Sequence, residues 1–332
     1  MTPADVVFSE NKWRLLRYRS RPQGAEFSTP VLLVPSLINR HYVLDLMPGK
    51  SFVETMVARG HDVFIIDWGT PGPEDRYLTF DDICDRYLGR AVRQTLRASG
   101  SERLHLLGYC LGGLLTTLYG AVHREEIASM VALAAPIDFD DGGLMSGWIN
   151  SDDFSVDDLV DAFGNVPWPL MQASFQMLKP TLPFRKAVGV LERAWDDRFL
   201  DGFFAIEKWG SDNVSFPGEC YRQYINDFYI ENKLIKDQFV LAGETVQLGD
   251  IESPLLVITF GNDHIVPAAS ASALLDRVSS VDVSHLHLPG GHVGAVISRK
   301  ASQTLWPQIS DWWAAREGEE SASESDVAAG GR

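Results

Sequence analysis

A pentapeptide with glycine at both ends and cysteine at its centre constrains the fold of this chain most strongly. It spans residues 108–112 (GYCLG), follows the apolar run 104–107 and precedes a stretch with a helical pattern. A sharp strand-to-helix turn needs small flanking residues, because larger side chains would collide with neighbouring strands. Gly113 adds further room. The pentapeptide therefore predicts a strand, a strained turn with Cys110 at its tip, and a helix.

Short apolar runs alternate along the chain with helical patterns, which is the signature of a mostly parallel sheet. Continuous apolar runs are expected of strands that are buried on both faces. The runs are 30–35, 62–68, 104–108, 127–134 and 255–260. Residues 283–288 form a further strand-like segment, and the helix candidates are 51–59, 80–98, 111–122, 268–278 and 301–316. A Gly-x-Cys-x-Gly turn in this context matches the nucleophile elbow of the α/β-hydrolase fold, with cysteine in place of serine. We therefore predict that fold.

The alternation is interrupted after the fourth run by an aromatic-rich, irregular segment. We expect residues 1–138 and 249–316 to form the hydrolase core and residues 139–248 to form an inserted, largely helical cap over the site. The alternative is a separate domain with its own core. Residues 317–332 are small, acidic and aperiodic, which predicts a disordered tail.

Composition narrows the function and the compartment. A net charge of −16 over 332 residues argues against nucleic-acid binding, which requires clustered Lys and Arg. Three cysteines without CxxC spacing suggest neither a disulfide framework nor a zinc site, and we expect no bound metal. No signal peptide is recognisable, and no apolar run approaches the roughly 20 residues that span a bilayer. We expect a cytoplasmic protein.

The cysteine of the pentapeptide has two interpretations. As a nucleophile, Cys110 would form a thioester, from which an acyl group can still be passed on. As a structural residue, it would be a small buried hydrophobe, which is common for cysteine. The pentapeptide alone does not decide between them.

Two later loops supply the partners that a nucleophile needs. In this fold the acid and then the base follow the nucleophile along the chain, each after a strand. Asp263 follows the run 255–260, and His292 follows the strand-like segment 283–288 in a glycine-rich loop. We predict that His292 takes the Cys110 proton and that Asp263 holds the imidazole in the correct tautomer.

Three further residues complete the predicted site. The oxyanion hole of the fold uses the amide after the nucleophile and one from a loop after an early strand. Leu111 is the first donor, and Ile38 is our choice for the second. His264 adjoins the proposed acid and is a candidate for a supporting hydrogen bond, or less favourably for the base itself.

Several longer stretches resemble the poly(3-hydroxyalkanoate) synthases, and among them the short class III catalytic subunits. These stretches are VPSLINRHYVLDLMPGKSFVETMVARGHDVFIIDWG, LLGYCLGG, LAAPIDFD, FPGECYRQYINDFYIENKL, FGNDHIVP, GGHVG and LWPQISDWW, which together cover the chain from Val31 to Trp313. Leu111 departs from the glutamine associated with class III at that position and is nearer the class I pattern.

The resemblance implies a cysteine acyltransferase that polymerises (R)-3-hydroxyacyl units from coenzyme A thioesters without a cofactor. Short units such as 3-hydroxybutyryl are the expected substrate. It also implies a second, non-catalytic subunit, a homodimer or hetero-oligomer, and a location at the surface of polymer granules. Either the aspartate or the histidine would activate the incoming hydroxyl. A thioesterase or an intracellular polyester depolymerase with the same triad remains the alternative, and a non-catalytic scaffold is a further one.

Overall fold

An eight-stranded sheet forms the centre of the computed structural model, which describes residues 1–140, 143–151, 154–178 and 190–317. The strand order is β1-β2-β6-β3-β7-β8-β11-β12, antiparallel up to β6 and parallel from β6 to β12. The strands are β1 (Ala4–Glu10), β2 (Trp13–Tyr18), β3 (Val31–Val34), β6 (Val63–Asp67), β7 (Leu104–Tyr109), β8 (Ile127–Leu133), β11 (Leu255–Phe260) and β12 (Val283–Leu288). Each predicted apolar run is a strand of this sheet, and the predicted α/β-hydrolase fold is confirmed.

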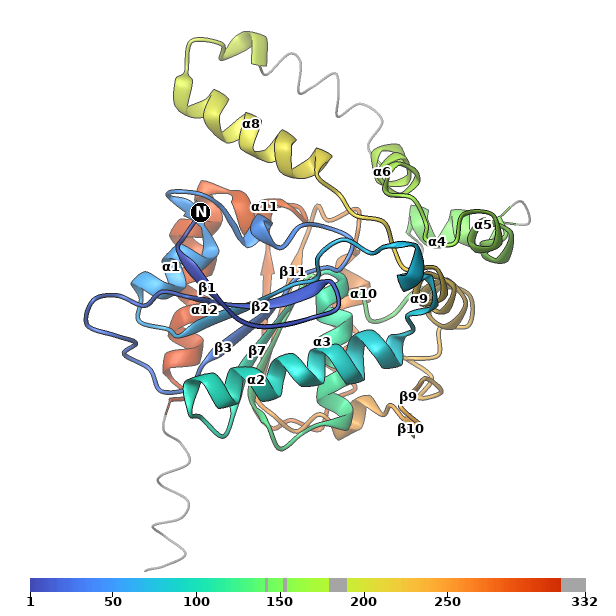
Figure 1. Ribbon diagram of the computed structural model, residues 1–332, viewed down its shortest axis with the longest axis horizontal. Coiled ribbons are helices and arrows are strands. Elements are labelled where there is room, and N and C mark those ends of the chain that lie inside the picture. The colour runs from blue at the N-terminus through green and yellow to red at the C-terminus, as the bar shows by residue number, and fades with distance from the viewer. Residues whose placement is uncertain (141–142, 152–153, 179–189, 318–332) are drawn as a thin grey trace, which may run out of the picture.

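Helices cover both faces of the sheet (Figure 1). Alternate residues of β3 point to opposite sides, so that Leu32 and Val34 belong to one buried cluster, while Val31 and Leu33 belong to the other. The first cluster includes residues of α2 and α3, and the second includes residues of α1 and α12. The bounds are α1 (Phe52–Ala58), α2 (Gly89–Ser99), α3 (Leu111–Val122), α10 (Ala268–Ser272), α11 (Gly294–Ile297) and α12 (Arg299–Ala314). This three-layer arrangement explains why the central strands are apolar throughout.

Two local features differ from the sequence-based expectation. The helix predicted for 80–98 begins as a π-helix, η3 (Asp81–Leu88), and continues as α2. The helix predicted for 268–278 ends early, because α10 stops at Ser272 and turns follow. The N-terminal hairpin of β1 and β2 was not predicted, since β1 has no buried residue and lacks a continuous apolar run.

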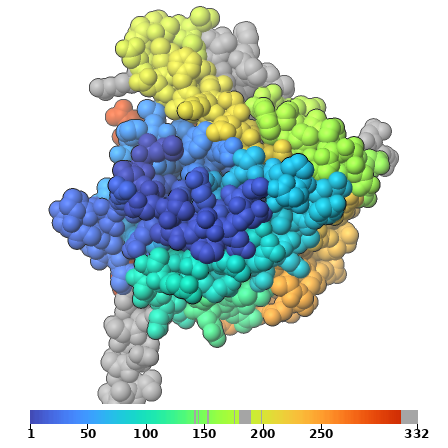
Figure 2. Space-filling model, in the orientation of Figure 1, coloured from blue at the N-terminus to red at the C-terminus, as the bar shows by residue number. Residues whose placement is uncertain are grey.

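The segment between β8 and β11 contains most of the remaining helices. These are α4 (Leu144–Ile149), α5 (Val156–Phe163), α6 (Trp168–Met177), α8 (Asp197–Ser211), α9 (Gly218–Gln223) and the π-helix η4 (Tyr224–Ile230). Phe139, Phe228 and Phe239 from this segment share a buried cluster with Phe80, which precedes η3. By contrast, α8 stands out from the body as an arm (Figures 1 and 2).

Short elements complete the described chain. They are η1 (His41–Leu44), η2 (Pro73–Tyr77), η5 (Leu248–Asp250) and two small hairpins, β4 (Asp45–Met47) with β5 (Lys50–Ser51) and β9 (Val240–Leu241) with β10 (Glu244–Thr245). Glu317, the first residue of the predicted tail, accepts hydrogen bonds from the backbone of Ser28 and Thr29. Residues 318–332 of that tail, and 141–142, 152–153 and 179–189 of the predicted cap, lie outside the described residues.

Candidate active site

The turn between β7 and α3 holds Cys110 in a strained backbone conformation. Its φ is +56° and its ψ is −127°, and its amide donates to the carbonyl of Leu133 at 3.0 Å. A Cβ atom on Gly108 would lie 2.2 Å from Thr116 Oγ1, and one on Gly112 would lie 2.0 Å from the Val34 carbonyl oxygen. Both glycines are therefore required by close backbone approach. The thiol itself is half-buried.

Asp263 and His292 form a buried pair at the carboxyl ends of β11 and β12. His292 Nδ1 lies 2.7 Å from Asp263 Oδ2, and the Asp263 side chain is fully buried. The other carboxylate oxygen, Oδ1, accepts from the backbone N–H groups of Ile265 and Val266, each at 2.9 Å. Both oxygens of Asp263 thus accept hydrogen bonds: Oδ1 holds the carboxylate against the backbone, and Oδ2 orients the imidazole ring.

The environment of His292 favours the charged ring. Burial lowers the pKa of the imidazole, but the negative charge of Cys110 and the hydrogen bond that His292 donates to Asp263 outweigh burial and raise the pKa to about 10. The second ring nitrogen, Nε2, is buried and has no oxygen or nitrogen partner among the described residues. The structure therefore places Cys110 and His292 on the lining of one cavity and pairs His292 with Asp263. The arrangement can support a thiolate beside an imidazolium.

Tyr109 is a supporting residue that sequence reasoning missed. Its ring stacks on His292 with centroids 5.1 Å apart, and its hydroxyl donates to the His292 carbonyl oxygen at 3.3 Å. The side chain is buried, which raises the pKa of its phenol far above the usual value. The residue before Cys110 therefore packs against the proposed base. Only its place inside the glycine-flanked turn could have drawn attention to it.

Two cavities meet at Cys110. The larger, of about 400 Å³, has a mainly apolar lining that also includes the polar side chains of Asn39, Gln172, His264 and His292. The smaller, of about 60 Å³, is largely apolar, with Met145, Ile149 and Met171 from the segment 139–248, and also Leu111, Tyr224 and Val266. Ile38, Cys110 and Ile265 line both cavities. Apolar surface dominates both cavities, and the thiol lies between the wide opening and the small recess.

The remaining predicted residues lie around these cavities. Ile38 and Leu111, the two proposed oxyanion donors, line the smaller cavity together with Cys110. His264 is exposed and faces the larger cavity, beside Asp263 but outside the Asp263–His292 hydrogen bond.

The other thiols differ from Cys110 in their surroundings. Cys84 and Cys220 are buried, and burial raises the pKa of each thiol well above its usual value. Reagents that react with thiolates therefore have one favoured target, Cys110.

No group of three or more His, Cys, Asp or Glu side chains in the described ranges is arranged to hold a metal ion. Within the same residues, no helix combines the length and the apolar character that crossing a bilayer requires.

Family models match two parts of the chain. Residues 29–292 match the model described as alpha/beta hydrolase fold. Residues 1–56 match the model described as poly-beta-hydroxybutyrate polymerase (PhaC) N-terminus.

Curated relatives extend these matches over almost the whole chain. The poly(3-hydroxyalkanoate) polymerase subunit PhaC of Haloferax mediterranei is 38% identical over 95% of this chain, which spans 64% of that protein. The subunit PhaC of Allochromatium vinosum is 38% identical over 94% of this chain and 88% of its own length. The putative non-heme bromoperoxidase BpoC of Mycobacterium tuberculosis is similar in structure, with a TM-score of 0.57, 15% identity, and coverage of 94% of this chain and 98% of BpoC. This last likeness concerns the fold alone.

Proposed function

The chain belongs to the poly(3-hydroxyalkanoate) polymerase PhaC family, and on that premise we propose that it polymerises (R)-3-hydroxyacyl units from coenzyme A thioesters. Short units such as 3-hydroxybutyryl are the proposed substrates. The observation that carries the proposal is the half-buried thiol of Cys110, which lies on a strained turn beside the buried Asp263–His292 pair.

The first step transfers the acyl group to the enzyme. The Cys110 thiolate attacks the acyl carbonyl, a new carbon–sulfur bond forms, and the bond to the coenzyme A sulfur breaks. The leaving sulfur takes a proton from the His292 imidazolium. The backbone amides of Leu111 and Ile38 would stabilise the negative oxygen that develops in between. Because one thioester replaces another, little free energy is lost before the next step.

The second step makes the polymer bond. The 3-hydroxyl of another unit attacks the thioester, an ester bond forms and the Cys110 thioester bond breaks. We propose that His292, which is neutral at this point, accepts the proton of that hydroxyl. Both Asp263 oxygens already accept hydrogen bonds, whereas Nε2 of His292 has no oxygen or nitrogen partner in the described residues. This transfer restores the thiolate and the imidazolium, so the cycle needs no redox cofactor.

The two cavities suggest how the substrate lies. The recess of about 60 Å³ suits the short side group of a hydroxyacyl unit, and the wider opening of about 400 Å³ has room for coenzyme A and the growing chain. The small recess supports the proposed preference for short units. The exposed position of His264 supports a contact with substrate in the larger cavity.

The finer assignments from the family resemblance are also proposals. The protein would act in the cytoplasm at the surface of polymer granules. It would bind a non-catalytic second subunit and assemble as a homodimer or hetero-oligomer. Size-exclusion chromatography with light scattering, with and without a candidate second subunit, measures the assembly directly.

The test of the activity is incubation with 3-hydroxybutyryl-CoA. Release of coenzyme A is followed with a thiol reagent, and the products are separated by size. Polymer together with coenzyme A supports the proposal. Coenzyme A with only free hydroxy acid contradicts it and favours a thioesterase or a depolymerase. Absence of any acyl-enzyme favours a non-catalytic scaffold.

A further inference from the structure

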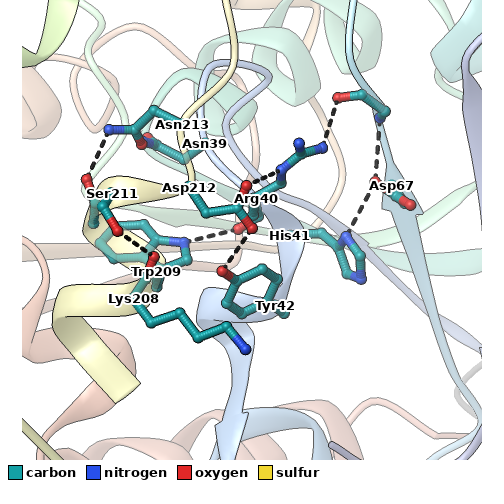
Figure 3. Close-up of polar contacts among 12 residues, drawn as sticks. Asn39, Arg40, His41, Tyr42, Asp67, Lys208, Trp209, Ser211, Asp212 and Asn213 are labelled. Carbon is teal, nitrogen blue, oxygen red and sulfur yellow. Dashed lines mark hydrogen bonds and ion pairs between the residues drawn. The ribbon is translucent and has the colours of Figure 1, made fainter. Parts of the chain in front are cut away.

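A group of polar contacts ties the loop that carries Ile38 to the C-terminal end of the arm helix α8. The loop residues are Asn39, Arg40 and Tyr42, and the α8-side residues are Trp209, Asp212 and Asn213 (Figure 3). We call this group the clasp. The two sides are about 170 residues apart in the sequence, with separations of 169 to 174.

Two contacts of the clasp involve the Asp212 carboxylate. Arg40 Nε donates to Asp212 Oδ1 at 3.0 Å, and the Tyr42 hydroxyl donates to Asp212 Oδ2 at 2.9 Å. Burial and this hydrogen bond raise the pKa of Tyr42 to about 12, so the phenol remains a donor at neutral pH. One carboxylate thus holds two residues of the loop.

Backbone and amide contacts extend the clasp on both sides. Trp209 Nε1 donates to the Arg40 carbonyl at 3.0 Å, and Asn39 Nδ2 donates to Asn213 Oδ1 at 2.7 Å. Next to them, the Val214 amide donates to the Ile38 carbonyl at 3.4 Å. The carbonyl of the proposed oxyanion residue is therefore bound directly by the chain that leaves α8.

Residues from both sides of the clasp line the larger cavity at Cys110. Ile38 and Asn39 line the larger cavity together with Trp209, Gly210 and Asn213. Away from the clasp the chain is more exposed, since Phe204 of α8 is 60% exposed and Trp195, which precedes α8, is 79% exposed. The clasp thus links the C-terminal end of α8 to a loop that lines the same cavity as Cys110.

We propose that Asp212 is a positioning residue, which fixes the Ile38 loop against α8 and so holds the second oxyanion donor beside Cys110. The inference rests on the proposed acyl transfer and on the assignment of Ile38 as a donor. Asp212 touches neither Cys110 nor His292 in the structure, and its action is through the loop. Loss of a single oxyanion donor lowers rates by about 100- to 1000-fold. A loosened donor should cost about 10- to 100-fold.

The test compares two reactions of the same thiol in Asp212→Ala. Acyl transfer from p-nitrophenyl butyrate or 3-hydroxybutyryl-CoA develops an oxyanion, whereas alkylation by iodoacetamide does not. We expect acyl transfer to fall about 10- to 100-fold while alkylation changes less than about threefold. The matched control is Asp196→Ala, which removes the N-terminal cap of the same helix and none of the clasp contacts. Tyr42→Phe removes one contact of Asp212 and should give an intermediate loss.

Each result decides the inference. Equal losses in the two reactions, or an unchanged rate of acyl transfer, would overturn it. Asp196→Ala with the same selective loss would also overturn it, because any loosening of α8 would then suffice. If the wild-type protein is acylated by p-nitrophenyl butyrate but not by 3-hydroxybutyryl-CoA, the proposed polymerase is contradicted. The role of Asp212 is then tested with the ester alone. Failure with both donors would overturn both proposals.

Discussion

Asp263→Asn is the substitution that probes the proposed triad most specifically. The asparagine side chain can still accept the hydrogen bonds that Oδ1 receives from Ile265 and Val266. Its amide group would then face His292 Nδ1 as a donor. This reverses the tautomer of the neutral ring and places the proton on Nε2, so that the nitrogen facing Cys110 cannot accept the thiol proton.

The size of the effect follows from the pKa of His292. In the fold the pKa of His292 rises from 6.5 to about 10, and a tenfold change in the population of the charged ring corresponds to about 1.4 kcal/mol. The charge of Cys110 is the largest of the raising causes, so Asp263 accounts for only part of the rise. We therefore expect alkylation of Cys110 at pH 7 to slow by about 10- to 100-fold. Acyl transfer should slow by more, since the base is also mispositioned.

The assay is the rate of iodoacetamide alkylation as a function of pH, read by mass spectrometry at Cys110. The burial and raised pKa values of Cys84 and Cys220 keep these thiols from obscuring the signal. Asp75→Asn is the matched control, because Asp75 is also buried and accepts from the Asn11 side chain and the Gly72 amide. Alkylation of Asp263→Asn at the wild-type rate would refute the reasoning.

Three further predictions concern stability and positioning. Gly112→Ala should lower the free energy of unfolding by roughly 3 kcal/mol or more, since its Cβ would lie 2.0 Å from a backbone oxygen; urea denaturation measures this, and a loss below 1 kcal/mol would contradict the packing argument. Tyr109→Phe should cost about 1 kcal/mol of stability and keep most activity, because the stacked ring is retained; activity lost in full would show that the hydroxyl does more than donate to a carbonyl. Burial lowers the folded-state pKa of His61 and of His105 to about 4, below the usual 6.5, so the unfolded chain binds protons that the fold excludes. Stability should therefore be full above about pH 6.5 and fall by about 2 kcal/mol per ring between pH 7 and pH 5; urea titrations at the two pH values test this, and a His105→Gln variant with an equally steep fall would argue against it.

The central strands could be predicted because a strand buried on both faces needs apolar side chains at consecutive positions. Val63–Asp67 and Leu255–Phe260 are buried at every position. All their residues are apolar except Asp67 and Thr259. The turn at Cys110 could also be predicted, because the close approach of neighbouring chain segments excludes residues larger than glycine on either side of it. The chain order of Asp263 and His292 followed from the topology of the fold.

Other parts depend on contacts between distant segments, which local patterns do not encode. β1 has only the short apolar stretch Val6–Phe8 and no buried residue, and its strand conformation depends on pairing with β2. The stack of Tyr109 on His292 joins residues 183 positions apart, and the Asp212 clasp joins residues that share no motif. Such features become visible only when the loops at the ends of the strands are placed together.

The most direct measurement of the central claim is mass spectrometry of the protein quenched shortly after mixing with 3-hydroxybutyryl-CoA. We predict hydroxybutyryl units attached to the peptide that contains Cys110, released by hydroxylamine and absent in Cys110→Ala, together with polymer among the later products. Acylation at another residue, or turnover to free hydroxy acid without polymer, would contradict the account.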